Sequence, residues 1–272
     1  ELPEGAVYEP FHPVMENWVR QIRAMPHEDV QITSFDGLKL FGTYYEYAPG
    51  APIELMFHGY RGTAERDLSG GVVRCFQVRR SALIVDQRCA TRSDGSTITF
   101  GIREHKDCLA WIDFAISKFG PDVKLVLTGI SMGAATVLMA GGEKLPPNVV
   151  GILADCGYTS ARDIMEDVIS KMGLPPKPCY PFVKLGAKIF GRFDPDENSP
   201  IEAVRRCTVP VIFFPGEADD FVPWRMTVQA HEACVSEKEI YLIEKADHGL
   251  SYLVDTEGCK KAISAFLERN RK

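Results

Sequence analysis

The sequence predicts an α/β protein with a mostly parallel sheet of eight strands, covered by helices on both faces, in one domain spanning residues 1–272. Three observations lead to this prediction. Short apolar runs alternate with segments of helical periodicity, a pattern typical of parallel sheets. Several runs are apolar throughout, as strands buried on both faces are. With 272 residues, 45% of them hydrophobic, the chain can form one large domain and does not require two.

An N-terminal extension, residues 1–29, precedes the first predicted strand. Prolines interrupt it at positions 3, 10, 13 and 26 and leave room for one short helix. Val14, Trp18 and Ile22 recur there at the spacing of a single helical face. We therefore expect this short helix to pack onto the domain.

The other elements are predicted from periodicity and turn residues. Asp36-Gly37 favours a tight turn between two strands, so an antiparallel hairpin opens the sheet. The predicted strands lie at residues 30–35, 38–47, 53–57, 82–86, 125–128, 149–154, 209–214 and 239–243. Helical spacing predicts helices at residues 68–79, 104–119, 134–140, 224–234 and 258–269.

Gly129, Ser131 and Gly133 form the pattern G-x-S-x-G between a predicted strand and a helix of small residues. In a nucleophile elbow this sharp turn holds the serine hydroxyl out of the sheet, and the flanking glycines let the turn close. The free N–H groups of the following helix favour a developing negative charge. The alternative is an ordinary turn, but the flanking strand and helix favour the elbow.

A serine hydroxyl needs a base within hydrogen-bond reach, and the base needs an orienting acid. Open α/β sheets place such groups at the carboxyl ends of their strands. The loop after residues 239–243 carries His248, and the loop after residues 209–214 carries Asp219 and Asp220. The candidate catalytic residues are therefore Ser131, His248 as the base, and one of the two aspartates as the acid.

Three further strand ends carry polar groups. The His58-Gly59-Tyr60 turn follows the strand at residues 53–57, where the backbone N–H of Tyr60 can join that of Met132 in an oxyanion hole. His58 itself is interpreted as a structural residue of its loop. Asp86 and Asp155 also end strands, but they are less favoured as the acid because the aspartate loop directly precedes the histidine loop.

Residues 156–207 interrupt the alternation of strands and helices. This stretch contains six prolines and is too short for a full domain, so we predict a small helical cap insert. It is the only stretch long enough to cover Ser131. The predicted pocket lining consists of Tyr60, Met132, Tyr158, Phe221 and Trp224. The alternative is that these side chains belong to the ordinary core. A small cap predicts short-chain or small aromatic acyl groups.

Composition excludes several classes of function. The net charge is −6 and no basic block occurs, which argues against nucleic acid as a partner. No apolar run approaches the roughly 18 residues of a membrane span. The eight cysteines form no C-x-x-C pair, no metal-ligand spacing is visible, and no cofactor is expected. We expect a cytoplasmic protein with reduced thiols; removal of a leader or anchor is the alternative, and the oligomeric state stays open.

Over residues 30–270 the sequence resembles the α/β-hydrolase superfamily, and within it bacterial serine esterases and S33 aminopeptidase-like or cinnamoyl-esterase-like hydrolases. The matching segments are His58-Gly59-Tyr60-Arg61-Gly62, Gly129-Ile130-Ser131-Met132-Gly133, Gly216-Glu217-Ala218-Asp219, Val222-Pro223 and Ala246-Asp247-His248. The resemblance implies the α/β-hydrolase fold and selects Asp219 as the acid. One loop, residues 88–95, departs from the Arg-Gly-His-Gly-x-Ser run of many relatives, so substrate preference is not transferred.

Three functions are compatible with these residues. The first is a serine hydrolase that cleaves carboxylic esters through an acyl-enzyme. The second is an aminopeptidase or amidase on the same residues, which requires an anionic site for a substrate amine. The third is a non-catalytic ligand-binding protein that keeps the fold, since fold does not imply function. The intact set of Ser131, Asp219 and His248 favours the first two over the third.

Overall fold

A computed structural model describes residues 2–270. Its sheet has eight strands in the order β1-β2-β4-β3-β5-β6-β7-β8. The strands are β1 (Glu28–Thr33), β2 (Lys39–Tyr45), β3 (Ile53–Phe57), β4 (Ser81–Asp86), β5 (Leu125–Ile130), β6 (Val149–Asp155), β7 (Val211–Phe214) and β8 (Lys238–Ile240). The strand β2 runs opposite to the other seven, and all pairs that do not involve it are parallel, so the predicted mostly parallel eight-stranded sheet is confirmed.

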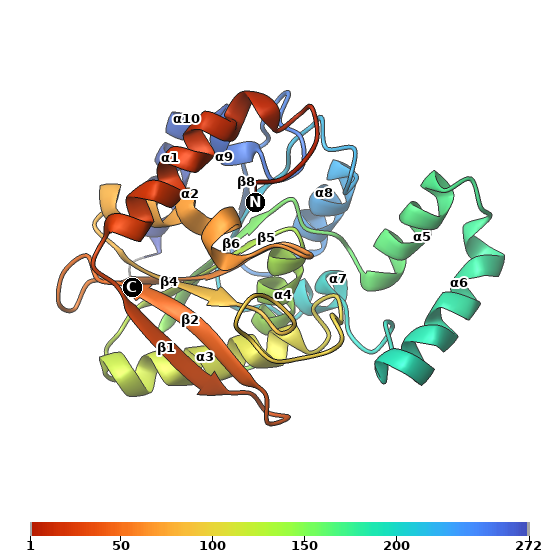
Figure 1. Ribbon diagram of the computed structural model, residues 1–272, viewed down its shortest axis with the longest axis horizontal. Helices are drawn as coiled ribbons and strands as arrows, with labels where there is room; N and C mark the ends of the chain where they lie inside the picture. The colour runs from red at the N-terminus through yellow and green to blue at the C-terminus, as the bar shows by residue number, and fades with distance from the viewer. Residues whose placement is uncertain (1, 271–272) are drawn as a thin grey trace.

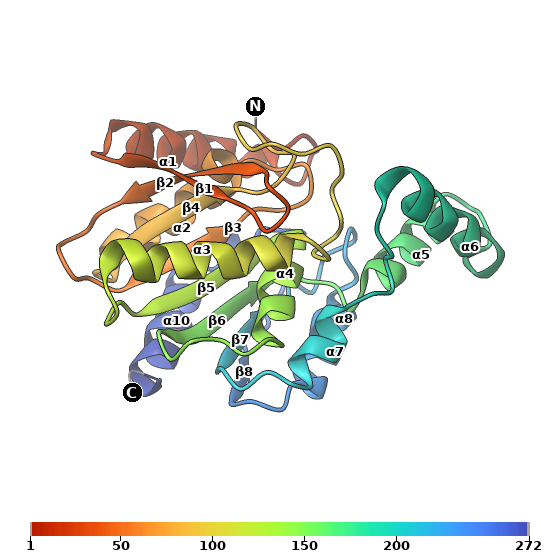
Figure 2. The same cartoon turned by 90° about the horizontal axis from the view of Figure 1, so that it is seen from below.

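Helices cover both faces of the sheet, as Figures 1 and 2 show. Side chains of α3, α4 and α8 pack on one face, and those of α2 and α10 pack on the other, with α1 lying against α2. The helices are α1 (His12–Ala24), α2 (Ala64–Gln77), α3 (Glu104–Phe119), α4 (Met132–Gly141), α5 (Ala161–Lys171), α6 (Pro176–Gly186), α7 (Pro200–Val204), α8 (Trp224–Ala233), α9 (Ser251–Val254) and α10 (Thr256–Arg269). None of them, within residues 2–270, is both long and apolar enough to cross a membrane.

Most predicted elements lie within a few residues of the observed ones, and the exceptions have local causes. The hairpin at Asp36-Gly37 is present, with Gly37 at φ +87°. The helix predicted to begin at residue 68 begins at Ala64, because the Thr63 side chain caps it by accepting a hydrogen bond from the Arg66 N–H. The last strand is shorter than predicted, and Ile243 forms only an isolated bridge with Gly216.

The N-terminal helix α1 packs differently from the expected single apolar face. Ile22 is fully buried, but Val14 is 43% exposed, so the sequence-based face was wrong at Val14. Trp18 lies against α2 instead: a Cβ atom built on Gly70 would be only 2.6 Å from the Trp18 ring. A glycine at position 70 therefore allows the indole to approach the α2 backbone closely.

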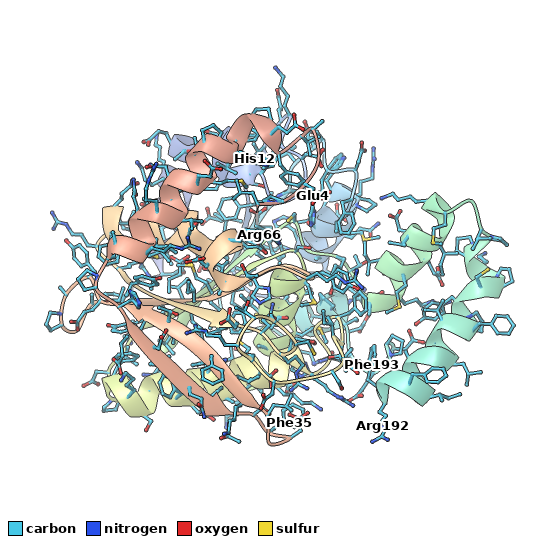
Figure 3. The ribbon with its side chains drawn as sticks, viewed as in Figure 1. Glu4, His12, Phe35, Arg66, Arg192 and Phe193 are labelled. Atoms are coloured by element: carbon cyan, nitrogen blue, oxygen red, sulfur yellow. The ribbon has the colours of Figure 1, made fainter. Side chains whose placement is uncertain are left out.

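The stretch predicted as an insert forms an arm beside the body, made of α5, α6 and a π-helical turn at Ala187–Gly191 (Figures 1 and 2). Its outer side is apolar and exposed, with Phe182 at 74% and Phe190 at 85% exposure. Figure 3 marks the place where the arm returns, at Arg192 and Phe193. Phe193 is buried there against Ile102. A division of the chain into extension, body and cap remains our proposal.

All eight cysteines are free in the structure, and six of them are buried. Buried thiols of this kind pack as small apolar side chains. We therefore expect thiol titration of the denatured protein, without reductant, to count eight free groups. A count of six or fewer would mean an oxidised pair and would contradict the expected reduced state.

Candidate active site

Ser131 sits at the corner between β5 and α4, with backbone angles of φ +57° and ψ −117°. Such angles are strained for a residue with a side chain. The two glycines make the corner possible. A Cβ on Gly129 would lie 2.1 Å from the Gly133 carbonyl oxygen, and one on Gly133 would lie 2.1 Å from the Phe57 carbonyl oxygen. Only glycine fits at either position, so the local geometry is that of a nucleophile elbow.

Ser131, His248 and Asp219 are brought together from three different loops. Ser131 Oγ lies 2.9 Å from His248 Nε2, and His248 Nδ1 lies 2.8 Å from Asp219 Oδ2. With Nδ1–H donating to the carboxylate, Nε2 is free to accept the serine proton. Ser131 and Asp219 are each only 5% exposed, so these hydrogen bonds are shielded from water.

The structure distinguishes the two adjacent aspartates. The second carboxylate oxygen of Asp219, Oδ1, accepts hydrogen bonds from the N–H groups of Phe221 and Val222 at 3.0 and 2.8 Å. These bonds fix the carboxylate plane so that Oδ2 faces His248. The neighbouring Asp220 is exposed, and its backbone N–H points to Asp247. Asp219 is therefore the aspartate that can orient the histidine.

The turn after β3 is held rigidly beside Ser131. His58 is buried, its Nδ1–H donates to the Gly59 carbonyl at 2.8 Å, and its Nε2 accepts the Gln87 N–H at 3.0 Å. Burial lowers the pKa of His58, which favours this neutral form. Within residues 2–270, the N–H groups of Tyr60 and Met132 donate to no protein acceptor. They remain free for an oxygen atom bound at Ser131.

A cavity of about 240 Å³ opens at Ser131 and His248. Two predicted pocket residues, Tyr60 and Phe221, line it, and the Phe221 ring lies 4.9 Å from the His248 ring. The other three, Met132, Tyr158 and Trp224, lie outside this lining, so the prediction was wrong for them. Tyr158 is instead buried, in a core cluster that also contains Met132, since it faces the interior below the elbow.

Asp155, at the end of β6, is a half-buried neighbour of the site that the sequence did not select. Its Oδ1 accepts a hydrogen bond from the Ser251 hydroxyl at 2.8 Å, and its backbone carbonyl accepts the Ser131 N–H at 2.9 Å. Burial raises the pKa of Asp155 to about 7, against the attraction of Ser251 and His248. The Asp155 carboxyl group, at the end of β6, thus stays protonated in mildly acidic solution.

This raised pKa predicts a pH dependence of stability. The unfolded chain releases the Asp155 proton near pH 3.8, whereas the native protein holds it to about 7. The free energy of unfolding therefore falls as pH rises between these values, by up to about 4 kcal/mol. We expect Asp155→Asn to remove this fall, because its amide oxygen can still accept from Ser251. Urea unfolding of both proteins at pH 4.5, 6 and 7.5 measures the effect; parallel curves would contradict it.

Cys156 brings a third potential metal ligand next to the site. Its sulfur and the ligand atoms of Asp219 and His248 lie within 4.8 Å of one another. The aspartate and histidine are, however, already hydrogen-bonded to each other. Burial also raises the pKa of the Cys156 thiol well above its ordinary value, which disfavours the thiolate that binds metals. The hydrogen-bonded pair accounts for this cluster without a metal.

Comparisons with known proteins place the fold. No protein-family profile matches the chain. The uncharacterized protein YqkD of Bacillus subtilis strain 168 is 25% identical over 189 residues, which is 69% of this chain and 62% of that relative. The matched stretch therefore spans less than two thirds of the relative's length.

Solved structures match over nearly the whole chain. The esterase Pf2001 of Pyrococcus furiosus has a TM-score of 0.74 at 20% identity, covering 93% of this chain and 94% of that one. The alpha/beta hydrolase GrgF from Penicillium sp. sh18 has a TM-score of 0.68 at 18% identity, covering 90% and 99%. At such low identities the likeness concerns the fold alone. The protein therefore has the α/β-hydrolase fold.

Proposed function

We propose that the protein is a serine hydrolase that cleaves carboxylic esters through an acyl-enzyme. One observation carries this proposal: the continuous hydrogen-bonded series from Ser131 Oγ through His248 to Asp219, with steps of 2.9 and 2.8 Å. A buried serine on a strained turn, next to a histidine with an orienting carboxylate, is the arrangement that activates a hydroxyl nucleophile. The similarity of the fold to that of the Pyrococcus furiosus esterase Pf2001 supports it.

The proposed reaction has two balanced halves. Ser131 Oγ attacks the ester carbonyl carbon while His248 Nε2 takes the hydroxyl proton, and His248 then passes that proton to the departing alkoxide oxygen. An alcohol leaves and the acyl group remains on Ser131. Water attacks the acyl carbon in the second half, giving its proton to His248. The carboxylic acid leaves and Ser131 regains its proton.

Two sets of groups stabilise the charges that develop during the reaction, on the imidazolium ion and on the oxyanion. Asp219 keeps the imidazole in the required tautomer and stabilises the imidazolium ion. The free N–H groups of Tyr60 and Met132 are our proposed oxyanion hole, because they border Ser131 and lack protein acceptors within the described residues. Preorganised donors of this kind stabilise the tetrahedral intermediate by about 3 kcal/mol each.

An aminopeptidase is less well supported. It requires a free carboxylate for the substrate ammonium group, and two aspartates line the cavity. Asp67 is already committed, since it accepts the Arg66 guanidinium at 2.6 Å and the Gly59 N–H at 3.2 Å. Asp155 has a raised pKa of about 7 and offers little negative charge below it. An uncharged ester fits this cavity better than a cationic amine does.

The short or small aromatic acyl group expected from the sequence depended on the insert covering Ser131. Among the described residues, none from 156–207 lines the cavity at Ser131. The premise of that expectation therefore does not hold for this cavity. The acyl group has to be inferred from the cavity itself.

Two assays test the proposed function. A fluorophosphonate probe should label the native protein covalently at one residue, which a non-catalytic binding protein would not allow. A panel of p-nitrophenyl esters and aminoacyl p-nitroanilides then separates esterase from aminopeptidase. We expect hydrolysis of the esters at a kcat/KM at least about a hundredfold above that of the anilides. Failure of labelling, or a preference for the anilides, would overturn the proposal.

A further inference from the structure

The cavity at Ser131 extends into the body of the protein and away from the arm. Beyond Ser131 and His248, it runs under the N-terminal segment, α1 and α2. Figure 3 shows Arg66 of α2, a lining residue, below the N-terminal stretch that carries Glu4 and His12. The inner walls are mostly apolar and include Met15, Trp18, Met56, Leu153, Phe214 and Ile263. We call this inner part the α1 chamber.

Trp18 forms the roof of the α1 chamber. Its ring lies against the backbone of α2 at Gly70 and stands 5.8 Å from the Tyr252 ring, which also lines the chamber. The neighbouring Gly71 leaves space on the same helix for Met56, whose sulfur would be 2.8 Å from a Cβ there. Two adjacent glycines in α2 thus lower the stability of the helix, and the space left by their missing side chains is filled by Trp18 and Met56.

The roof is tied to the candidate catalytic loop. Tyr8, in the segment before α1, donates its hydroxyl proton to the backbone carbonyl of His248 at 3.1 Å. Tyr8 also lines the cavity, as does Pro3. The N-terminal segment therefore borders the cavity and is tied to the residue proposed as the base.

Apart from His248 and the Arg66–Asp67 ion pair, the charged residues that line the cavity are Arg74 and Asp155. Arg74 is 6% exposed and is paired with the fully buried Glu54. Glu54 in turn accepts the Thr128 hydroxyl at 2.7 Å. Asp155 accepts a hydrogen bond from the Ser251 hydroxyl and is held largely protonated by burial below about pH 7. No uncompensated charge among these described residues calls for an ionic ligand, so the chamber suits an uncharged aliphatic group.

The volume sets the size of that group. An apolar cavity of about 150 Å³ holds benzene, with its six carbons, so a cavity of 240 Å³ has room for roughly ten aromatic carbons, or about eight of the bulkier aliphatic ones. Because Ser131 lines the cavity, the acyl carbon of a bound ester would sit at the serine and its chain would occupy the remaining space. A long fatty chain would exceed this space, and acetate would leave most of it unfilled.

We propose that the α1 chamber, roofed by Trp18, binds the acyl group of the substrate, and that this group is an unbranched aliphatic chain of about eight carbons. This inference rests on the proposed ester hydrolysis at Ser131. It makes Trp18 a specificity-determining residue and gives the exposed arm no part in acyl selection.

Specificity constants for p-nitrophenyl acetate, butyrate, octanoate and dodecanoate test the inference. We expect kcat/KM to peak at octanoate, about tenfold above butyrate, because each buried methylene adds binding free energy. Trp18→Ala should lengthen the chamber and raise the ratio of dodecanoate to octanoate about fivefold. Phe182→Ala, a truncation on the exposed arm, is the control and should leave this ratio unchanged.

A binding measurement separates the inference from the proposed function. Calorimetric titration of octanoate into Ser131→Ala, which cannot form an acyl-enzyme, should show one site, and adding Trp18→Ala should weaken it about tenfold. Octanoate binding without ester hydrolysis would overturn the esterase proposal, but the inference that the chamber binds an aliphatic chain would stand. Three results would overturn the inference about the chamber. They are hydrolysis that peaks at acetate, the absence of octanoate binding, and a dodecanoate-to-octanoate ratio that changes with Phe182→Ala and not with Trp18→Ala.

Discussion

Ser131→Ala should abolish covalent labelling by fluorophosphonate and lower kcat for ester hydrolysis by about 10⁶-fold, the scale measured when a serine hydrolase loses its nucleophile. The reason is geometric as well as chemical. Ser131 Oγ is 2.9 Å from His248 Nε2, and the strained corner holds it there. Alanine leaves the base without a proton to take. Stopped-flow burst amplitude and mass-spectrometric labelling measure the loss.

Ser96→Ala is the matched control, because Ser96 is an exposed serine in the loop before α3. It should keep full labelling and full activity. Circular dichroism and the urea midpoint should show that Ser131→Ala remains folded. Residual hydrolysis well above the uncatalysed rate is expected in this variant, since substrate binding and the oxyanion donors remain. Undiminished labelling of Ser131→Ala would exclude Ser131 as the nucleophile.

Asp219→Asn should lower kcat by about 10⁴-fold with little change in KM, as expected when an orienting aspartate is lost. The carboxylate of Asp219 accepts His248 Nδ1–H at 2.8 Å and two backbone N–H groups through its other oxygen. Asparagine can keep the backbone bonds through its carbonyl oxygen. Its NH₂ group would then face Nδ1 and favour the tautomer that carries the proton on Nε2, which cannot accept from Ser131.

Asp220→Asn supplies the internal comparison at the next position. Asp220 is exposed, and only its backbone N–H reaches toward Asp247, so its side chain should be dispensable. We expect activity within a factor of about two of the native protein. A larger loss at Asp220 than at Asp219 would reverse the assignment, and equal losses would show that the loop as a whole, rather than one carboxylate, supports the histidine.

Much of the fold could be predicted because the signals are local. Asp36-Gly37 fixes a hairpin within four residues, and the wholly apolar strand at residues 53–57 can be recognised without reference to its partners. The start of α2 was predicted four residues late because its periodic apolar residues begin after Ala64. Thr63 was the available signal, since threonine is a preferred N-cap residue.

The candidate site could be predicted where chemistry limits the residue types. Serine between two glycines, with an aspartate and a histidine after the last strands, leaves few choices, and Asp219 required either the resemblance or the geometry. The surrounding cavity, unlike the candidate catalytic residues, could not be predicted from the sequence. Trp18, Gly70 and Tyr252 meet across more than two hundred residues of chain, and any apolar side chain can line a pocket. An adjacent glycine pair inside a helix, Gly70-Gly71, was the one local signal of a close approach.

The position of α1 separates two tasks that many sites combine. α1 carries none of the three side chains proposed for the chemistry, yet it supplies the Trp18 roof of the chamber beside them. Substitutions at Met15 and Trp18 would change the wall of the chamber without replacing Ser131, Asp219 or His248, provided that Tyr8 keeps its hydrogen bond to the His248 carbonyl. Descendants of this chain can diverge in substrate while retaining one reaction, and residues 12–24 are where laboratory selection for a new ester should begin.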